Sequence, residues 1–166
     1  MFKINFKKIL LNFILVFFIF FLDRFSKIYI LNLVEIESKI DIYITSYLNL
    51  YLIWNKGIAF GLLSSEGSFI YNAVTLVIIF VSIVVLIMAI KTSGFIRYSF
   101  LFILGGSLGN LFDRIYYTAV PDFIDLHIND FHWFIFNVAD IFITVGVACL
   151  IYAEIFFNKE KNEKTF

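Results

Sequence analysis

The chain has 166 residues, of which 61% are hydrophobic and only 16% are charged, and its formal net charge at pH 7 is zero. A soluble domain is usually about half apolar and a quarter charged, so this composition excludes an ordinary soluble domain and indicates an integral membrane protein, expected to form a single domain over residues 1–166. Zero net charge provides no basic surface for nucleic acid, and a single cysteine, Cys149, excludes an intrachain disulfide and a multi-cysteine metal cluster.

Four apolar runs are long enough to cross a bilayer, which takes about 20 residues. They lie at about 9–29, 69–90, 98–117 and 134–157. We predict that all four are helices, because lipid offers no partner for open backbone groups and the runs lack the alternation of barrel strands. The first run follows several lysines, as in a signal peptide, but the chain continues with Asp23-Arg24-Phe25 and no small-residue cleavage site, so we expect a retained helix.

The distribution of lysine and arginine predicts the orientation. These residues precede the first span, separate the second from the third, and follow the fourth. The positive-inside rule then places both termini in the cytoplasm, and segments 30–68 and 118–133 outside. Strand-like alternation in 42-IYITSYLNLYLIW-54 predicts a small sheet or an amphipathic platform in the first outer segment. The expected fold is therefore a mainly α membrane protein, with four transmembrane helices and a small sheet or amphipathic platform on its outer side.

Three aspartates share one predicted depth in the membrane. At 1.5 Å per residue from the cytoplasmic anchors, Asp23, Asp113 and Asp140 lie about 22, 24 and 26 Å across. Asp122, in the second outer loop, can fold back to the same level. Each charge at membrane depth costs several kcal/mol unless it is paired or hydrated, so we expect one shared polar site near the outer boundary.

Local spacing supports a shared site. Asp23 and Lys27 stand at i, i+4 in the favourable order for a helical ion pair. Polar residues also recur at i, i+3 on the last two spans, in Asn110–Asp113 and Asn137–Asp140. The Gly105–Gly109 step allows close helix contact, so we expect the third and fourth spans to face each other with their polar sides.

Paired carboxylates can carry acid–base chemistry. Two neighbouring acids cannot both ionise easily, so they share a proton and provide one base to activate water and one acid to protonate a carbonyl. This favours peptide hydrolysis, with proton-coupled transport as the alternative and a non-enzymatic scaffold as a third reading. A transporter needs polar residues continuing toward the cytoplasm, and the inner half of the second span carries none beyond Ser82.

Five motifs, spread in order over nearly the whole chain, give it a resemblance to the signal peptidase II family, the bacterial intramembrane aspartic proteases. They are 23-DRFSK-27, 55-NKGIAFG-61, 105-GGSLGNLFDR-114, 121-PDFID-125 and 136-FNVAD-140. The resemblance implies removal of signal peptides from prolipoproteins, by cleavage before a diacylglyceryl-modified cysteine in the bacterial inner membrane. It also implies a mainly α fold of four transmembrane helices with a small extracytoplasmic β-cradle between the first and second spans. Inhibition by the peptide antibiotic globomycin is a further implication. We expect contact with membrane lipid, no cofactor and a monomer.

The resemblance also assigns residues. The catalytic pair corresponds to Asp122 and Asp140. Substrate-binding or site-supporting positions correspond to Asp23, Lys27, Asn55, Gly57, Asn110, Asp113, Arg114 and Asn137. One departure from the family pattern is Pro121 in place of the usual Val, which removes a backbone donor and stiffens the expected turn beside Asp122.

Two histidines, His127 and His132, flank Asn129-Asp130 in the second outer segment. Loop histidines without tight spacing are typical surface residues, so we expect no metal site there.

Overall fold

The computed structural model describes residues 6–37, 41–57, 68–129 and 131–163. Its helices are α1 (Phe6–Glu37), α2 (Ser68–Lys91), α3 (Gly94–Tyr117) and α4 (Val138–Glu163). Each is long and apolar enough to cross a membrane. The prediction of four spanning helices is therefore confirmed, and the chain is a multi-pass membrane protein.

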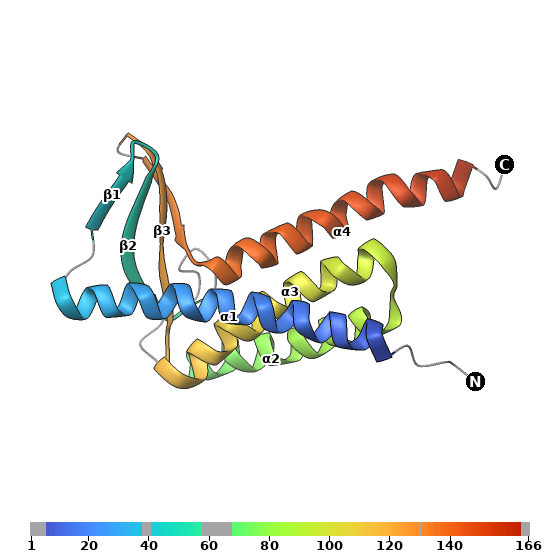
Figure 1. Cartoon of the computed structure of the whole chain (residues 1–166), viewed down its shortest axis with the longest axis horizontal. Helices are drawn as coiled ribbons and strands as arrows, with labels where there is room; N and C mark the ends of the chain where they lie inside the picture. The colour runs from blue at the N-terminus through green and yellow to red at the C-terminus, as the bar shows by residue number, and fades with distance from the viewer. Residues whose placement is uncertain (1–5, 38–40, 58–67, 130, 164–166) are drawn as a thin grey trace.

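One four-stranded antiparallel sheet stands at one end of the helices (Figure 1). Its strands, in spatial order, are β1 (Asp41–Thr45), β2 (Leu48–Asn55), β3 (Val120–Ile128) and β4 (Phe131–Phe136). The start of α1, the turn between α2 and α3, and the end of α4 lie at the opposite end of the molecule. The sheet predicted between the first and second helices is present, as β1 and β2.

The second outer segment was expected to be a loop, and this expectation is wrong. Most of it forms β3, which pairs with β2, and the following residues form β4. Consequently the fourth helix starts at Val138 and not at 134, because residues 131–136 pair with β3. Pro121 lies in β3 opposite Trp54 and is fully buried, so it occupies a strand and not the expected turn.

The first helix also extends beyond its predicted end at 29, to Glu37. Its additional turns place Ile30 and Leu33 at helical spacing against the sheet, where they pack with Phe123 of β3. This apolar cluster fixes the base of the sheet on α1.

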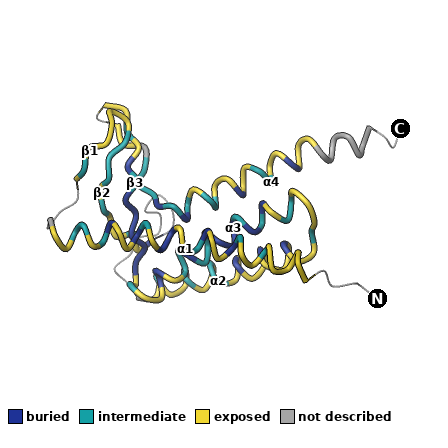
Figure 2. Tube along the Cα trace, in the orientation of Figure 1, coloured by how far each residue is buried: buried dark blue, intermediate teal, exposed yellow. Residues whose placement is uncertain are grey.

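Helix α3 is the central helix, and it contacts α1, α2 and α4. Figure 2 shows buried residues on α3 and at the base of β3, while the outward faces of the helices are exposed. Those exposed faces are rich in Phe, Ile, Leu and Val, which suits contact with lipid. Helix α3 ends at Tyr117 and is capped by Thr118, whose φ of 56° is left-handed, and the chain then turns into β3.

Candidate active site

Helix α4 begins with a reciprocal cap that holds Asp140 in place. The Asp140 N–H donates to Asn137 Oδ1 at 3.1 Å, and the Asn137 N–H donates to Asp140 Oδ2 at 3.1 Å. This is the geometry of a capping box, with Asn137 as the N-cap and the acid three residues later. The N-terminal end of a helix carries partial positive charge. Both features stabilise negative charge on Asp140.

Asp122 reaches the same place from strand β3. Its side chain accepts two amide hydrogen bonds, from Asn137 Nδ2 to Oδ1 at 2.6 Å and from Asn55 Nδ2 to Oδ2 at 3.0 Å. Asn55 ends β2, the neighbouring strand, so the sheet register sets this contact. Asn137 therefore contacts both aspartates.

The environment of Asp122 favours its protonated form. Burial, and secondly the charge of Asp140, raise the pKa of Asp122 from 3.8 to about 6, although the hydrogen bonds from Asn55 and Asn137 act in the opposite direction. A carboxyl group with this pKa can hold or release a proton near neutral pH.

A cavity of about 120 Å³ separates the end of the sheet from α4. Its lining residues are Asp122, Phe134, Ile135, Phe136, Asp140, Ile143 and Thr144. Two acids thus face one space that is otherwise mostly apolar, and the space is large enough to hold water. The prediction that Asp122 and Asp140 converge agrees with this arrangement.

Three asparagine side chains have their amide orientation fixed by their partners. Asn137 Oδ1 accepts from the Asp140 N–H, Asn55 Oδ1 accepts from the Gly57 N–H at 2.8 Å, and Asn110 Oδ1 accepts from Lys27 Nζ at 2.9 Å. Each of these partners can only donate a hydrogen bond, so the NH₂ group of each amide must point away from that partner. In each case the NH₂ group donates to an aspartate; Asn110 Nδ2, for example, donates to Asp140 Oδ1 at 2.8 Å.

A neutral cluster of buried charges lies behind Asn110. Lys27 Nζ donates to Asp23 Oδ2 at 2.8 Å and to Asp113 Oδ2 at 2.6 Å, as well as to Asn110. Arg24 Nη2 forms an ion pair with Asp113 Oδ1 at 2.5 Å. The two acids balance the two bases, and all three ammonium hydrogens of Lys27 are used. Pairing of this kind is what makes charge tolerable at membrane depth.

The predicted ion pair of Asp23 with Lys27 is present. The acids at one predicted depth do not all line the same cavity. Asp23 and Asp113 are absent from the cavity lining and serve the ionic cluster instead. Asp23 also accepts the Ala139 N–H at 2.9 Å, which ties α1 to the first turn of α4. Arg24 was not predicted as a site residue, although its place beside Asp23 at membrane depth was a usable signal.

Arg114 and Gly57 form a second contact between α3 and the sheet. Arg114 Nη2 donates to the Gly57 carbonyl oxygen, and the guanidinium lies 5.5 Å from the centre of the Tyr71 ring. Arg114 Nε and Nη1 are buried and have no partner among the described residues. The rest of the 55-NKGIAFG-61 motif, residues 58–61, lies outside the part of the chain that the structure describes.

Small residues on α3 permit the close packing of this region. A Cβ atom at Gly109 would lie 2.5 Å from Asp23 Oδ2, and one at Gly105 would lie 2.8 Å from the Ile19 side chain. Gly105 therefore faces α1, contrary to the expectation that the glycine step serves α4. The contact between α3 and α4 uses Gly106 and Gly109, which both lie against Ala139. The expected meeting of the polar faces of these helices is confirmed by the bond from Asn110 to Asp140.

Comparison with known proteins gives a consistent result. The family model described as signal peptidase (SPase) II matches residues 15–156. A lipoprotein signal peptidase of Pelagibacter ubique (strain HTCC1062) is 58% identical over 163 residues, which cover 98% of each chain. Another from Anaplasma phagocytophilum (strain HZ) is 41% identical over 138 residues, which cover 81% of this chain and 85% of that one.

Solved structures agree with this result. Two bacterial membrane enzymes superpose with TM-scores of 0.67 and 0.64, at 26% and 25% sequence identity. The matches cover 87% and 88% of this chain, and 87% and 93% of the two enzymes. The family resemblance predicted from the five motifs is therefore confirmed, and the chain belongs to the signal peptidase II family of peptidases.

Proposed function

We propose that this protein is an aspartic endopeptidase that removes signal peptides from prolipoproteins, with Asp122 and Asp140 as its catalytic pair. The relatives described above are lipoprotein signal peptidases, which supports the substrate class; they give no support to a transporter. The observation that carries the catalytic assignment is the convergence of these two acids on one cavity, joined through Asn137.

In the proposed reaction, a water molecule lies between the two carboxyl groups. Asp140 is the base, because it sits at a helix N-terminus and accepts two N–H donors. Asp122 is the acid, because its pKa is raised to about 6. Asp140 takes a proton from the water as its oxygen attacks the scissile carbonyl carbon, while Asp122 protonates the carbonyl oxygen. The C–N bond then breaks, and the proton held by Asp140 passes to the leaving amine. One hydroxyl of the tetrahedral intermediate returns its proton to Asp122 as the new carboxyl group forms.

The remaining predicted residues have supporting roles in this proposal. Asn55, Asn110 and Asn137 orient the acids through their amide groups. Arg114 offers its unused N–H donors to a carbonyl of the substrate, and Gly57 positions Arg114. The cluster of Asp23, Lys27 and Asp113 holds Asn110 in place.

The membrane setting follows from the same proposal. The enzyme is a monomer of the bacterial inner membrane, with cytoplasmic termini and the sheet on the outer side. The substrate enters laterally, with its diacylglyceryl chains in lipid and its modified cysteine at the level of the cavity. Globomycin competes for this position.

The test uses purified full-length protein and a lipid-modified prolipoprotein. Asp122→Asn and Asp140→Asn are each expected to reduce cleavage by at least a thousandfold while the chain remains folded, and globomycin is expected to inhibit the parent enzyme. Asp41→Asn, an exposed acid on the same sheet, is the matched control and should retain activity. Near-parental cleavage by Asp122→Asn, together with loss in Asp125→Asn, would transfer the assignment to the neighbouring acid and overturn the proposal.

A further inference from the structure

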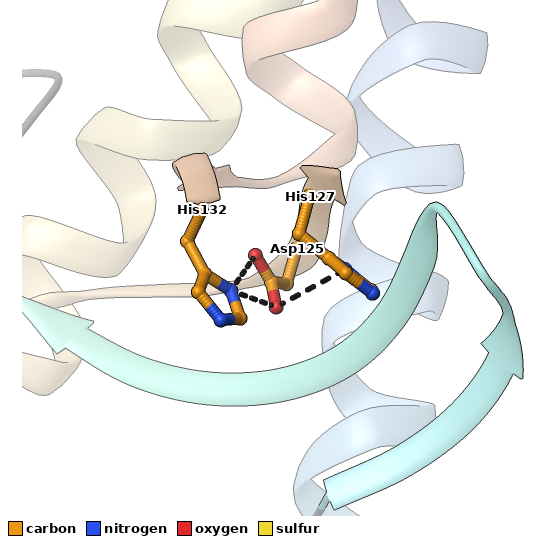
Figure 3. A group of neighbouring side chains, drawn as sticks. All are labelled: Asp125, His127 and His132. Atoms are coloured by element: carbon orange, nitrogen blue, oxygen red, sulfur yellow. Dashed lines mark hydrogen bonds and ion pairs between the residues drawn. The ribbon is translucent and has the colours of Figure 1, made fainter. Parts of the chain in front are cut away.

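A second polar cluster lies on the sheet, near the turn that joins β3 to β4 and away from the catalytic cavity. It consists of Asp125 and His127 from β3 and His132 from β4 (Figure 3). His127 and His132 are direct cross-strand partners, and their rings stack with centroids 5.2 Å apart. At about 3.3 Å per residue, Asp125 and His127 are about 10 and 17 Å along β3 from Asp122. The cluster is therefore a separate site.

The geometry of the three side chains suits a metal ion. His132 Nδ1 lies 2.8 Å from Asp125 Oδ2, and His127 Nδ1 lies 3.7 Å from the same oxygen. One donor atom from each residue lies within 4.8 Å of the others. Two ligands bound at about 2.1 Å to one ion are at most about 4.2 Å apart, so side-chain movements of less than about 1 Å bring all three into range.

An unsatisfied group in the cluster points to a ligand. The His127 side chain is only 9% exposed, yet its Nδ1 has no hydrogen-bond partner among the described residues. Buried polar atoms normally have partners, so this nitrogen needs an explanation. The expectation that both histidines are surface residues is wrong for His127, although His132 is 56% exposed.

A fourth donor is available from the neighbouring strand. Asn49 of β2 is the cross-strand partner of Asp125, so their side chains share a face of the sheet. Asn49 Oδ1 is also buried without a partner among the described residues. Asn49 Oδ1 is thus a further oxygen donor on the face of the sheet that Asp125 occupies.

We propose that Asp125, His127 and His132 bind one divalent transition-metal ion, with Zn²⁺ as the best fit and Asn49 as a candidate fourth ligand. Imidazole and carboxylate together are typical zinc ligands, whereas Mg²⁺ and Ca²⁺ take oxygen ligands. The exposed side of His132 gives the ion access from solvent. The bound ion fastens β3 to β4, and so stabilises the hairpin that carries Asp122.

The chain contains only two histidines, which makes the test sharp. The full-length protein is purified in detergent without a histidine tag, and Zn²⁺ binding is measured by titration calorimetry. We expect one ion per chain, at least tenfold weaker binding in His127→Ala and in His132→Ala, and unchanged binding in the control Asp41→Asn. With Cu²⁺ as the probe, electron paramagnetic resonance should show coupling to two imidazole nitrogens in the parent and to one in each variant.

Several outcomes would overturn the proposal: no Zn²⁺ binding, binding that neither histidine change weakens, or displacement of Zn²⁺ by equimolar Mg²⁺. His132 is exposed, so His132→Ala decides the question even where His127→Ala fails to fold. A second readout is thermal unfolding, which Zn²⁺ should shift upward in the parent and not in His132→Ala.

Discussion

Replacing Asp122 by Asn should stabilise the protein in a pH-dependent way while it abolishes cleavage. The folded-state pKa of Asp122 is about 6, against 3.8 for the free group. A carboxyl group with a raised folded pKa contributes most favourably at low pH, and this contribution is lost as pH rises from about 4 through 6. At pH 8 the ionised, 4% exposed Asp122 therefore costs about 3 kcal/mol relative to full protonation, and at pH 4.5 about 1 kcal/mol.

The variant has no charge to bury, so its stability relative to the parent should grow by about 2 kcal/mol between pH 4.5 and pH 8. The introduced amide also lowers the stability of the variant, because its NH₂ group would face an NH₂ group of Asn55 or Asn137. This loss is the same at both pH values, so it does not affect the difference between them. Urea unfolding in detergent, followed by tryptophan fluorescence, measures the difference, with Asp41→Asn as the exposed control. An equal advantage for the variant at both pH values would refute the assignment of a raised pKa to Asp122.

Further predictions concern the residues that support the pair. Lys27→Met leaves Asp23 and Asp113 short of a buried partner, so unfolding should become easier by about 3–5 kcal/mol in the same urea assay. Gly109→Ala puts a Cβ 2.5 Å from Asp23 Oδ2. Prolipoprotein cleavage should therefore fall at least tenfold, and the free energy of unfolding by about 1–3 kcal/mol. Unchanged cleavage together with unchanged stability would contradict this packing. Asn137→Ser keeps an N-cap for α4 but loses the amide that donates to Asp122. Turnover should therefore fall, while the free energy of unfolding drops by less than about 1 kcal/mol. A loss of activity matched by an equally large loss of stability would show that Asn137 has a purely structural role.

The number and order of the helices could be predicted because a long apolar segment in lipid must satisfy its backbone hydrogen bonds internally, as a helix does. The start of the fourth helix could not be predicted, because the apolar run before Asn137 belongs to β4 and not to α4. Averaged hydrophobicity along the sequence cannot distinguish an apolar strand from an apolar helix that follows it directly. Asn137 with an acid three residues later was the available signal for the start of the helix.

The second half of the sheet was missed for a different reason. Strand β3 is buried on both faces along its first half, including Pro121, Asp122 and Phe123. A strand covered on both faces loses the alternation of apolar and polar residues by which strands are recognised. Strands β1 and β2 are more exposed and kept the alternation, so they could be predicted.

The predicted depth of each aspartate in the membrane placed the aspartates at one level, but it did not identify which side chains each aspartate contacts there. Residue spacing gives the height of a side chain, while its direction depends on how the helices rotate against one another. Asp113 faces Lys27 and Arg24, whereas Asp140 faces the cavity. Asp122 could be assigned only through the family motif, because its position depends on the register of β3 against β2.

The ionic cluster and the cavity acids are held by different kinds of bonds, and this difference suits the roles proposed for them. Asp23, Asp113, Lys27 and Arg24 neutralise one another in ion pairs, so a change of protonation there would leave an unpaired buried charge. The cavity acids instead accept hydrogen bonds mainly from neutral amides, whose orientation is fixed from behind. A neutral donor stays in place whether its acceptor is charged or protonated, although the bond strength changes. In the proposed reaction, protons can therefore move between the acids and water while Lys27 and Asn110 keep the geometry constant.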